Sequence, residues 1–266
     1  MTPRRGPSAR VLREVAASVD APPALISCLP ELLADLTSLG SAPRRIVNLI
    51  ARHGLGREAR VMELACGKGA LAVMLAEKFG ARVEAFDAFA PFLDEGRALA
   101  ERKGVGSRVR FVRADVSRVR LRARADLALM IGLFPLERAA SALRRLVRPG
   151  GLYVIDDALR IPSRDPRGEF EHLHTARSAR ALIESLGDQA LQVLVLPVRD
   201  VARQNRAILR ALSRRATMLG RERPALSRPL REFLKRQREG SRALEGPIRP
   251  AIIVARRGAG RGERQA

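Results

Sequence analysis

From residue 60 to residue 155, short apolar runs alternate with segments whose apolar residues have helical spacing. The runs predict strands, and the segments between them predict helices. Strands separated by helices form βαβ units, which make neighbouring strands parallel. We expect strands at 60–65, 82–86, 109–112, 126–131 and 152–155, and helices at 70–79, 91–103 and 136–146. The sequence therefore predicts an α/β domain with a mostly parallel sheet.

The remainder of the chain is less regular. We expect a helix at 175–186, a strand at 191–197, an arginine-rich helical stretch at 201–238 and a last strand at 251–255. The prolines Pro224 and Pro229 are expected to break the helical stretch. Together these segments predict a Rossmann-like three-layer sandwich of about seven strands, with a helical insertion before the last strand. The expected domain spans 41–257 with the insertion at 198–246, between a partly helical arm at 1–40 and a disordered tail at 258–266.

Length and composition favour a single large cytoplasmic domain. The chain has 266 residues, 46% of them hydrophobic, which is enough to bury a substantial core. No stretch approaches the roughly 18 consecutive apolar residues of a membrane span, and the first 13 residues lack the apolar region of a signal peptide. Cys28 and Cys66 are the only cysteines. We therefore expect no membrane span, no disulfide framework and no bound metal.

The formal charge of +22 has two explanations. Such a charge attracts polyanions, and nucleic acid is a partner of this kind. However, the chain has only four lysines, so the charge is almost entirely arginine, and alanine is also abundant. This composition is expected of a GC-rich genome. Few aromatic side chains are present for base stacking, which favours the compositional explanation over nucleic-acid binding.

One segment, 61–70, combines a strand, a glycine turn and a helix start. Gly67 and Gly69 let the backbone pass close to a ligand or adopt positive φ angles. The N–H groups at the start of the following helix would face whatever occupies the turn. Residues 67–72 also fit the G-x-G-x-x-A form of a dinucleotide-binding turn, so the turn alone does not identify the ligand.

Three acids at successive strand ends help to identify the ligand of this turn. Glu63 lies in the strand before the glycines, where it would hold an ammonium group and repel a pyrophosphate. Asp87 ends the next strand, where a carboxylate can accept both hydroxyls of a ribose. Asp115 follows the third strand and can reach an adenine amino group. Together the three acids predict a site for an adenosyl ligand that carries positive charge.

These residues resemble the class I S-adenosyl-L-methionine (SAM)-dependent methyltransferases of the small-molecule type, over about residues 46–157. Segment 63–69 is similar to that family's acid-x-Gly-x-Gly-x-Gly motif, Asp87 to its ribose-binding acid, and Asp115 to its adenine-contacting acid. Ala65 departs from the family by replacing its first glycine, and alanine is tolerable there if its φ is negative. The resemblance implies SAM as the cofactor, contacted by Glu63, Ala65, Cys66, Gly67, Gly69, Asp87, Ala88, Asp115, Val116 and Ile131.

Methyl transfer needs the acceptor held in line with the methyl group, and hydroxyl or ammonium acceptors also need a base. Asp156 and Asp157 follow the fifth strand and are candidates for this base. His172, in the cluster 169–174, is a third candidate. No recognised metal-ligand spacing is present. Each of these residues can also be read as an ordinary surface or ion-paired group.

The primary hypothesis is methyl transfer from SAM to a small-molecule acceptor, for which the arginine-rich stretch could form a lid or bind an acidic group. A nucleic-acid (rRNA or tRNA) methyltransferase is an alternative, although residues 130–135 lack the Asn/Asp-Pro-Pro-aromatic motif of many base-methylating enzymes. A nicotinamide-dependent oxidoreductase could use the same glycine turn. A non-catalytic SAM-binding protein would keep the fold without the reaction.

Overall fold

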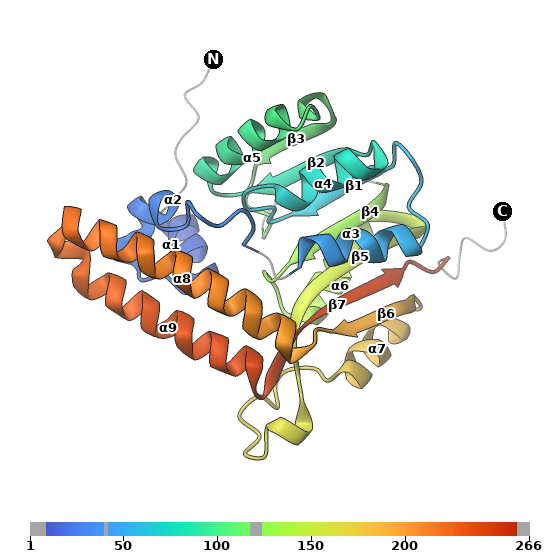
Figure 1. The fold of residues 1–266 in the computed structure, drawn as a ribbon. Coiled ribbons are helices and arrows are strands. Elements are labelled where there is room, and N and C mark those ends of the chain that lie inside the picture. The colour runs from blue at the N-terminus through green and yellow to red at the C-terminus, as the bar shows by residue number, and fades with distance from the viewer. Residues whose placement is uncertain (1–8, 40–41, 118–123, 260–266) are drawn as a thin grey trace.

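The structure, a computed structural model, describes residues 9–39, 42–117 and 124–259 (Figure 1). Its centre is a seven-stranded sheet with the order β3-β2-β1-β4-β5-β7-β6. The strands are β1 (Arg60–Leu64), β2 (Arg82–Asp87), β3 (Val109–Arg113), β4 (Ala125–Ile131), β5 (Val147–Arg160), β6 (Gln189–Val195) and β7 (Ile248–Arg256). The order reverses between β1 and β4, so the site is expected at the carboxyl ends of these strands.

The sheet is parallel from β3 to β5 and antiparallel at its other end. β1 pairs with β2 and β4 in parallel register, and β2–β3 and β4–β5 continue the pattern. β7 lies antiparallel between β5 and β6. The chain reaches β7 through a helical hairpin that returns it in the opposite direction. The predicted Rossmann-like fold, its mostly parallel sheet and its insertion before the last strand are confirmed.

Helices cover both faces of the sheet because successive strand residues point to opposite sides. On one face, Val61 packs with residues of α3 (Pro43–Arg52), α4 (Ala70–Phe79) and α5 (Ala90–Arg102). On the other, Met62 packs with residues of α6 (Leu136–Leu146) and α7 (Ala176–Ser185). The spacing of apolar residues in the sequence therefore accounts for the three layers.

A third apolar cluster joins the N-terminal segments to the helical insertion. The N-terminal segments are α1 (Ala9–Ser18), the 3-10 helix η1 (Pro23–Cys28) and α2 (Leu29–Leu32), and the insertion is α8 (Val198–Glu222), η4 (Pro224–Leu226) and α9 (Ser227–Glu245). Leu25 and Leu29 pack in one cluster with Leu212, Phe233 and the Phe89 that follows β2. Since Phe89 lies at the carboxyl edge of the sheet, both segments gather at that edge (Figure 1).

Several boundaries differ from those predicted. Pro229 does not break the helical stretch: it lies in the first turn of α9, where a proline needs no hydrogen-bonded N–H. β5 extends well beyond 152–155 on both sides, and β6 begins two residues before the predicted strand. The predicted domain start at residues 40–41, and most of the predicted tail and of the start of the arm, lie outside the described residues. Among the described residues, no helix is both long and apolar enough to span a bilayer.

Candidate functional site

The chain turns sharply between β1 and α4. Ala65 has a φ of 57°, Gly67 of 53° and Gly69 of 68°, so three of these five residues are in the left-handed region. Our condition for an alanine at position 65, a negative φ, is therefore not met. A left-handed alanine costs roughly 1–2 kcal/mol, which explains why the family usually has glycine at this position.

The two glycines are required by contacts within the chain as well as by φ. A Cβ on Gly69 would lie 2.4 Å from Cε1 of Phe111, and one on Gly67 would lie 3.3 Å from Cδ1 of Leu39. The ring of Phe111 on β3 thus packs directly under the turn. Leu39, from the segment before α3, covers the turn from the N-terminal arm.

Asp87 is held at the end of β2 with its carboxylate oriented by two backbone groups. The N–H of Gly67 donates to Oδ2 at 2.8 Å, and the N–H of Phe89 donates to Oδ1 at 2.9 Å. Burial raises the pKa of Asp87, and these hydrogen bonds oppose the rise. The backbone of Ala88 acts in the same way, and the lone pairs that stay free on the carboxylate are available to ligand hydroxyls.

Glu63 is the most unusual polar group of the site. Its exposed fraction is 2%, and its Oε2 has no hydrogen-bond partner among the described residues. Burial raises the pKa of Glu63 to about 8, a backbone hydrogen bond from Ala72 lowers it in part, and the charge of Asp87 raises it further. A buried carboxyl of this kind needs a cationic partner to be stable as a carboxylate. The effect of Asp87 on the pKa of Glu63 shows that the two carboxyls lie close enough to interact, and their contacts with a cofactor stay a prediction.

Cys66 lies in the same neighbourhood. Burial raises the pKa of its thiol well above the ordinary value, and Glu63 and Asp87 raise it further. The residue is 8% exposed and packs in the main core. At neutral pH it is therefore a thiol rather than a thiolate, so it is not an activated nucleophile.

The third acid, Asp115, lies beyond β3, next to the strand that carries Asp87. The N–H of Ala114 donates to the carbonyl of Asp87 at 2.9 Å, which aligns the two strand ends. Oδ1 of Asp115 accepts from the N–H of Ser117 at 3.0 Å and from its hydroxyl. Its charge also contributes to the raised pKa of Arg10, whose main partner is Glu14. Helix α1 therefore lies near this strand end.

The other predicted cofactor contacts lie along the same edge. Ala88 follows Asp87 directly, Val116 follows Asp115, and Ile131 is the last residue of β4. All three are partly exposed. Their places on neighbouring strand ends fit one extended ligand, and their contacts with it stay a prediction.

Lys68 is a residue whose role the sequence did not indicate. Its exposed fraction is 4%, although a lysine in a loop is expected to be solvated. Its Nζ donates to the carbonyl of Leu33 at 2.8 Å and forms an ion pair with Glu95 at 2.8 Å. Lys68 therefore ties the glycine turn to the N-terminal arm. Its position between two glycines was the only sequence signal for this role.

Two of the predicted bases, Asp156 and Asp157, lie within β5 rather than after it, because the strand continues to Arg160 in its pairing with β7. Asp156 is buried and opposite Ile131 in the β4–β5 register. Burial raises the pKa of Asp157, Glu137 raises it further, and His174 lowers it. His172 is exposed, and its ring contacts that of Phe170.

A histidine that we did not single out lies closer to Asp157. His174 Nε2 is 2.6 Å from Oε1 of Glu137, and its Nδ1 is 3.1 Å from Oγ of Ser178. Within the described ranges, no three metal-binding side chains are grouped so that they could hold a metal ion.

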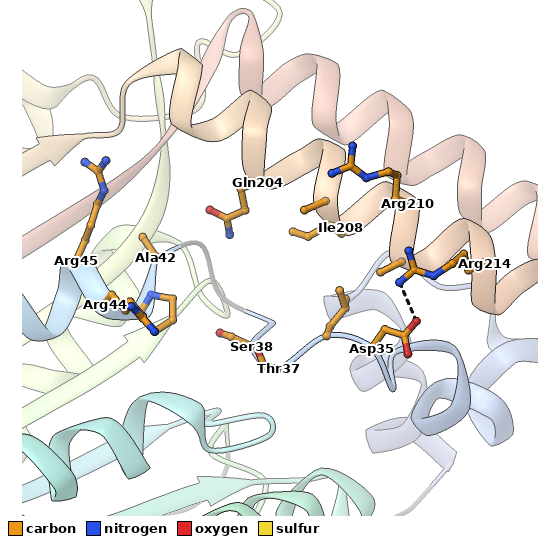
Figure 2. A pocket seen from close by; sticks show the side chains of 14 residues that line it. Asp35, Thr37, Ser38, Ala42, Arg44, Arg45, Gln204, Ile208, Arg210 and Arg214 are labelled. Atoms are coloured by element: carbon orange, nitrogen blue, oxygen red, sulfur yellow. Dashed lines mark hydrogen bonds and ion pairs between the residues drawn. The ribbon is translucent and has the colours of Figure 1, made fainter.

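A pocket of about 660 Å³ lies beside the glycine turn, between residues 35–38, the start of α3 and α8 (Figure 2). Thr37 and Ser38 face Gln204 and Ile208 of α8 across it. The same stretch of chain continues to Leu39, which contacts the turn at Gly67. The pocket therefore adjoins the predicted cofactor site.

Comparisons with known proteins agree with this geometry. A family described as "Methyltransferase domain" matches residues 61–151. A curated relative, an uncharacterized protein of Haemophilus influenzae, is 27% identical over 118 residues, which are 42% of this chain and 47% of that protein. The chain thus matches about half the length of this relative.

Solved structures share the fold at low identity. A SAM-dependent methyltransferase from Geobacter sulfurreducens in complex with S-adenosyl-L-homocysteine (SAH) has a TM-score of 0.73 and 18% identity, covering 86% of this chain and 97% of that one. Coclaurine N-methyltransferase bound to N-methylheliamine and SAH has a TM-score of 0.62 and 17% identity, covering 83% and 74%. At these identities the likeness shows the fold. Residues 61–151 are therefore similar to a methyltransferase domain, and the chain has the Rossmann-like fold that its sequence predicts and that these methyltransferases share.

Proposed function

We propose that this protein binds SAM at the carboxyl ends of β1, β2 and β3 and transfers its methyl group to a small-molecule acceptor. One observation carries the proposal. Glu63 is a buried carboxyl and Asp87 a partly buried one, both lie beside one glycine turn, and burial raises the pKa of each. Two such groups together favour a ligand that brings positive charge and hydroxyl groups.

The residues present fit SAM. Glu63 has a buried oxygen with no hydrogen-bond partner among the described residues, and an ammonium or sulfonium would compensate its charge. Asp87 is fixed by two backbone N–H groups and keeps lone pairs for a ribose. NAD fits less well, because its pyrophosphate would bring negative charge rather than a cation to the turn beside Glu63, and so could not stabilise the carboxylate.

Bound SAM supplies an electrophilic methyl group. The chain then has to position the acceptor, exclude water and, for a hydroxyl or ammonium acceptor, remove a proton. Asp157 suits proton removal best of the three candidates, because its pKa is raised and it follows Asp156, the residue of β5 that lies opposite the last residue of β4. Its Oδ1 accepts from the N–H of Ala158 at 2.7 Å, which orients the carboxylate. Asp156 and His172 stay as further candidates.

The acceptor is proposed to be small because of the size of the adjoining pocket. A volume of about 660 Å³ falls in the range of small-molecule sites. Coclaurine N-methyltransferase, which shares the fold, is bound to a small amine. The charge of +22 keeps nucleic acid as the second candidate, whose binding would weaken steeply with salt.

Calorimetric titration of SAM, SAH and NAD tests the cofactor. We expect SAM and SAH to bind with a micromolar Kd, about −8 kcal/mol, and the Asp87→Ala variant to lose at least tenfold in affinity. Asp94→Ala changes an exposed acid of α5 and serves as the control. Circular dichroism checks that both variants are folded. Tighter binding of NAD, or an equal loss in both variants, would refute the assignment.

Radiolabelled SAM tests the acceptor class. The protein is incubated with labelled SAM and a bacterial extract, which is then separated into RNA, protein and small-molecule fractions. We expect label in the small-molecule fraction from the wild type and none from Asp87→Ala. Label in the RNA fraction would favour the nucleic-acid alternative.

A further inference from the structure

The pocket beside the glycine turn carries positive charge that the described residues do not neutralise. Four arginines line it: Arg44, Arg45, Arg210 and Arg214. Arg45 forms an ion pair with Asp200, and Arg214 pairs with Asp35 at 3.2 Å. Arg44 and Arg210 have no ion pair with any described residue. Two positive charges at the pocket are therefore available to a ligand.

The rest of the lining is largely apolar. Leu36, Ala42, Pro43, Ala207, Ile208 and Ala211 contribute to the walls. Figure 2 shows Arg44 and Arg45 at one end of the pocket and Arg210 and Arg214 on α8, with Ile208 between them. Apolar walls with a few charged groups at defined places are typical of sites that bind a small organic molecule in one orientation.

The pocket also has a fixed relation to the predicted cofactor site. Residues 35–38 form one wall, and the next residue, Leu39, covers Gly67. Upstream of this wall, the carbonyl of Leu33 accepts from Lys68 of the glycine turn. A ligand in the pocket would therefore lie beside the turn that holds SAM in the proposed function.

We propose that this pocket binds the methyl acceptor, and that the acceptor is an amphiphilic organic anion: an apolar body with a carboxylate or phosphate group. The anionic group is bound by Arg44 or Arg210, and the apolar body lies against Leu36 and Ile208. Guanidinium groups bind both carboxylates and phosphates through paired N–H donors. This inference rests on the proposed function, since it names the substrate class of the same site.

Direct binding of simple probes tests it. Octanoate, octyl phosphate and neutral octanol are titrated into the full chain saturated with SAH. We expect both anions to bind at least tenfold more tightly than octanol, since hydrogen bonds between charged partners are stronger than those to a neutral hydroxyl. The variants Arg44→Gln and Arg210→Gln remove the two available charges one at a time, and their double variant removes both. At least one single variant should lose roughly tenfold in affinity for the anions, and the double variant should bind them like octanol.

Arg206→Gln is the matched control, because Arg206 is an exposed arginine of α8 outside the pocket. It should leave probe binding unchanged, and all four variants should keep the affinity for SAH. Equal binding of octanol and the anions, no binding of either anion, or an equal loss in Arg206→Gln overturns the inference. A loss of SAH affinity in the Arg44 or Arg210 variants also overturns it, because the arginines would then hold the cofactor. Failure of the wild type to bind SAH refutes the proposed function instead.

Discussion

Replacement of Glu63 by glutamine should change how the stability of the ligand-free protein depends on pH. The carboxyl has a pKa of about 8 in the folded chain, raised by burial, against an ordinary value of 4.5. Because the folded state disfavours the charged form, the Glu63 carboxyl loses its proton at a lower pH in the unfolded chain than in the folded one. Glu63 therefore destabilises the fold above pH 4.5, and the effect grows until pH 8.

The magnitude follows from these two pKa values. Each unit of pH between them costs about 1.4 kcal/mol once the unfolded carboxyl is fully ionised. The penalty is about 0.8 kcal/mol at pH 5 and about 3.4 kcal/mol at pH 7, a difference of roughly 2.5 kcal/mol. Glutamine has the same shape and no charge to bury, so the Glu63→Gln variant should lack this change. Part of the pH dependence should remain, because the pKa of Asp87 is also raised.

Urea unfolding at pH 5, 6 and 7 measures the effect. The free energy of unfolding of Glu63→Gln minus that of the wild type should rise by about 2.5 kcal/mol from pH 5 to pH 7. Glu77→Gln, at an exposed position of α4, should show no comparable rise. Saturating SAM should reduce the difference, because its positive charge would favour the carboxylate. A difference that stays constant with pH would show that Glu63 is not a buried, uncompensated carboxyl.

Four further substitutions test the local structure by urea unfolding. Gly69→Ala should destabilise the protein by roughly 3 kcal/mol, from its φ of 68° and the contact with Phe111, and no loss would contradict the turn. Ala65→Gly should stabilise the protein by up to about 1 kcal/mol, because glycine removes the strain of the φ of 57° but also gives the unfolded chain more entropy. A loss of stability would argue against that conformation. Asp188→Ala should cost about 3–5 kcal/mol, because the buried Asp188 accepts a hydrogen bond from Tyr153 at 2.9 Å and pairs with Arg144. Tyr153→Phe removes only the hydrogen bond and should cost about 1 kcal/mol. Equal effects of the two variants would contradict a buried ion pair.

The central sheet could be predicted because its signals are local. Apolar runs give the strands, the residues between them have helical spacing, and right-handed crossovers restrict the topology. Asp87 was predictable for the same reason: once β1 and β2 are parallel neighbours, the turn after one strand meets the acid after the other. The hydrogen bond from Gly67 to Asp87 makes this contact.

The N-terminal arm and the pocket could not be predicted in this way. Leu39 contacts Gly67, and Asp35 pairs with Arg214 and Arg215. These residues are far apart in the sequence, and the spacing of apolar residues does not predict such contacts. A lysine in a loop is expected to be solvated, but Lys68 is buried because the arm covers it. Ala65 was misjudged on φ because the strand ends one residue earlier than predicted.

Some of the arginines have a structural role, which neither nucleic-acid binding nor a GC-rich genome would explain. Arg214 and Arg215 of α8 pair with Asp35, and Arg223 after α8 pairs with Glu31 of α2. Ion pairs at exposed positions contribute little free energy each, so the arm is held mainly by the buried cluster that includes Leu25 and Phe233. The pairs instead fix the orientation of the arm on α8, since a shifted arm would leave its acids without partners. That orientation sets the wall of the pocket at residues 35–38, across from Arg210, which pairs with no acid among the described residues and is therefore available to the anion that we propose.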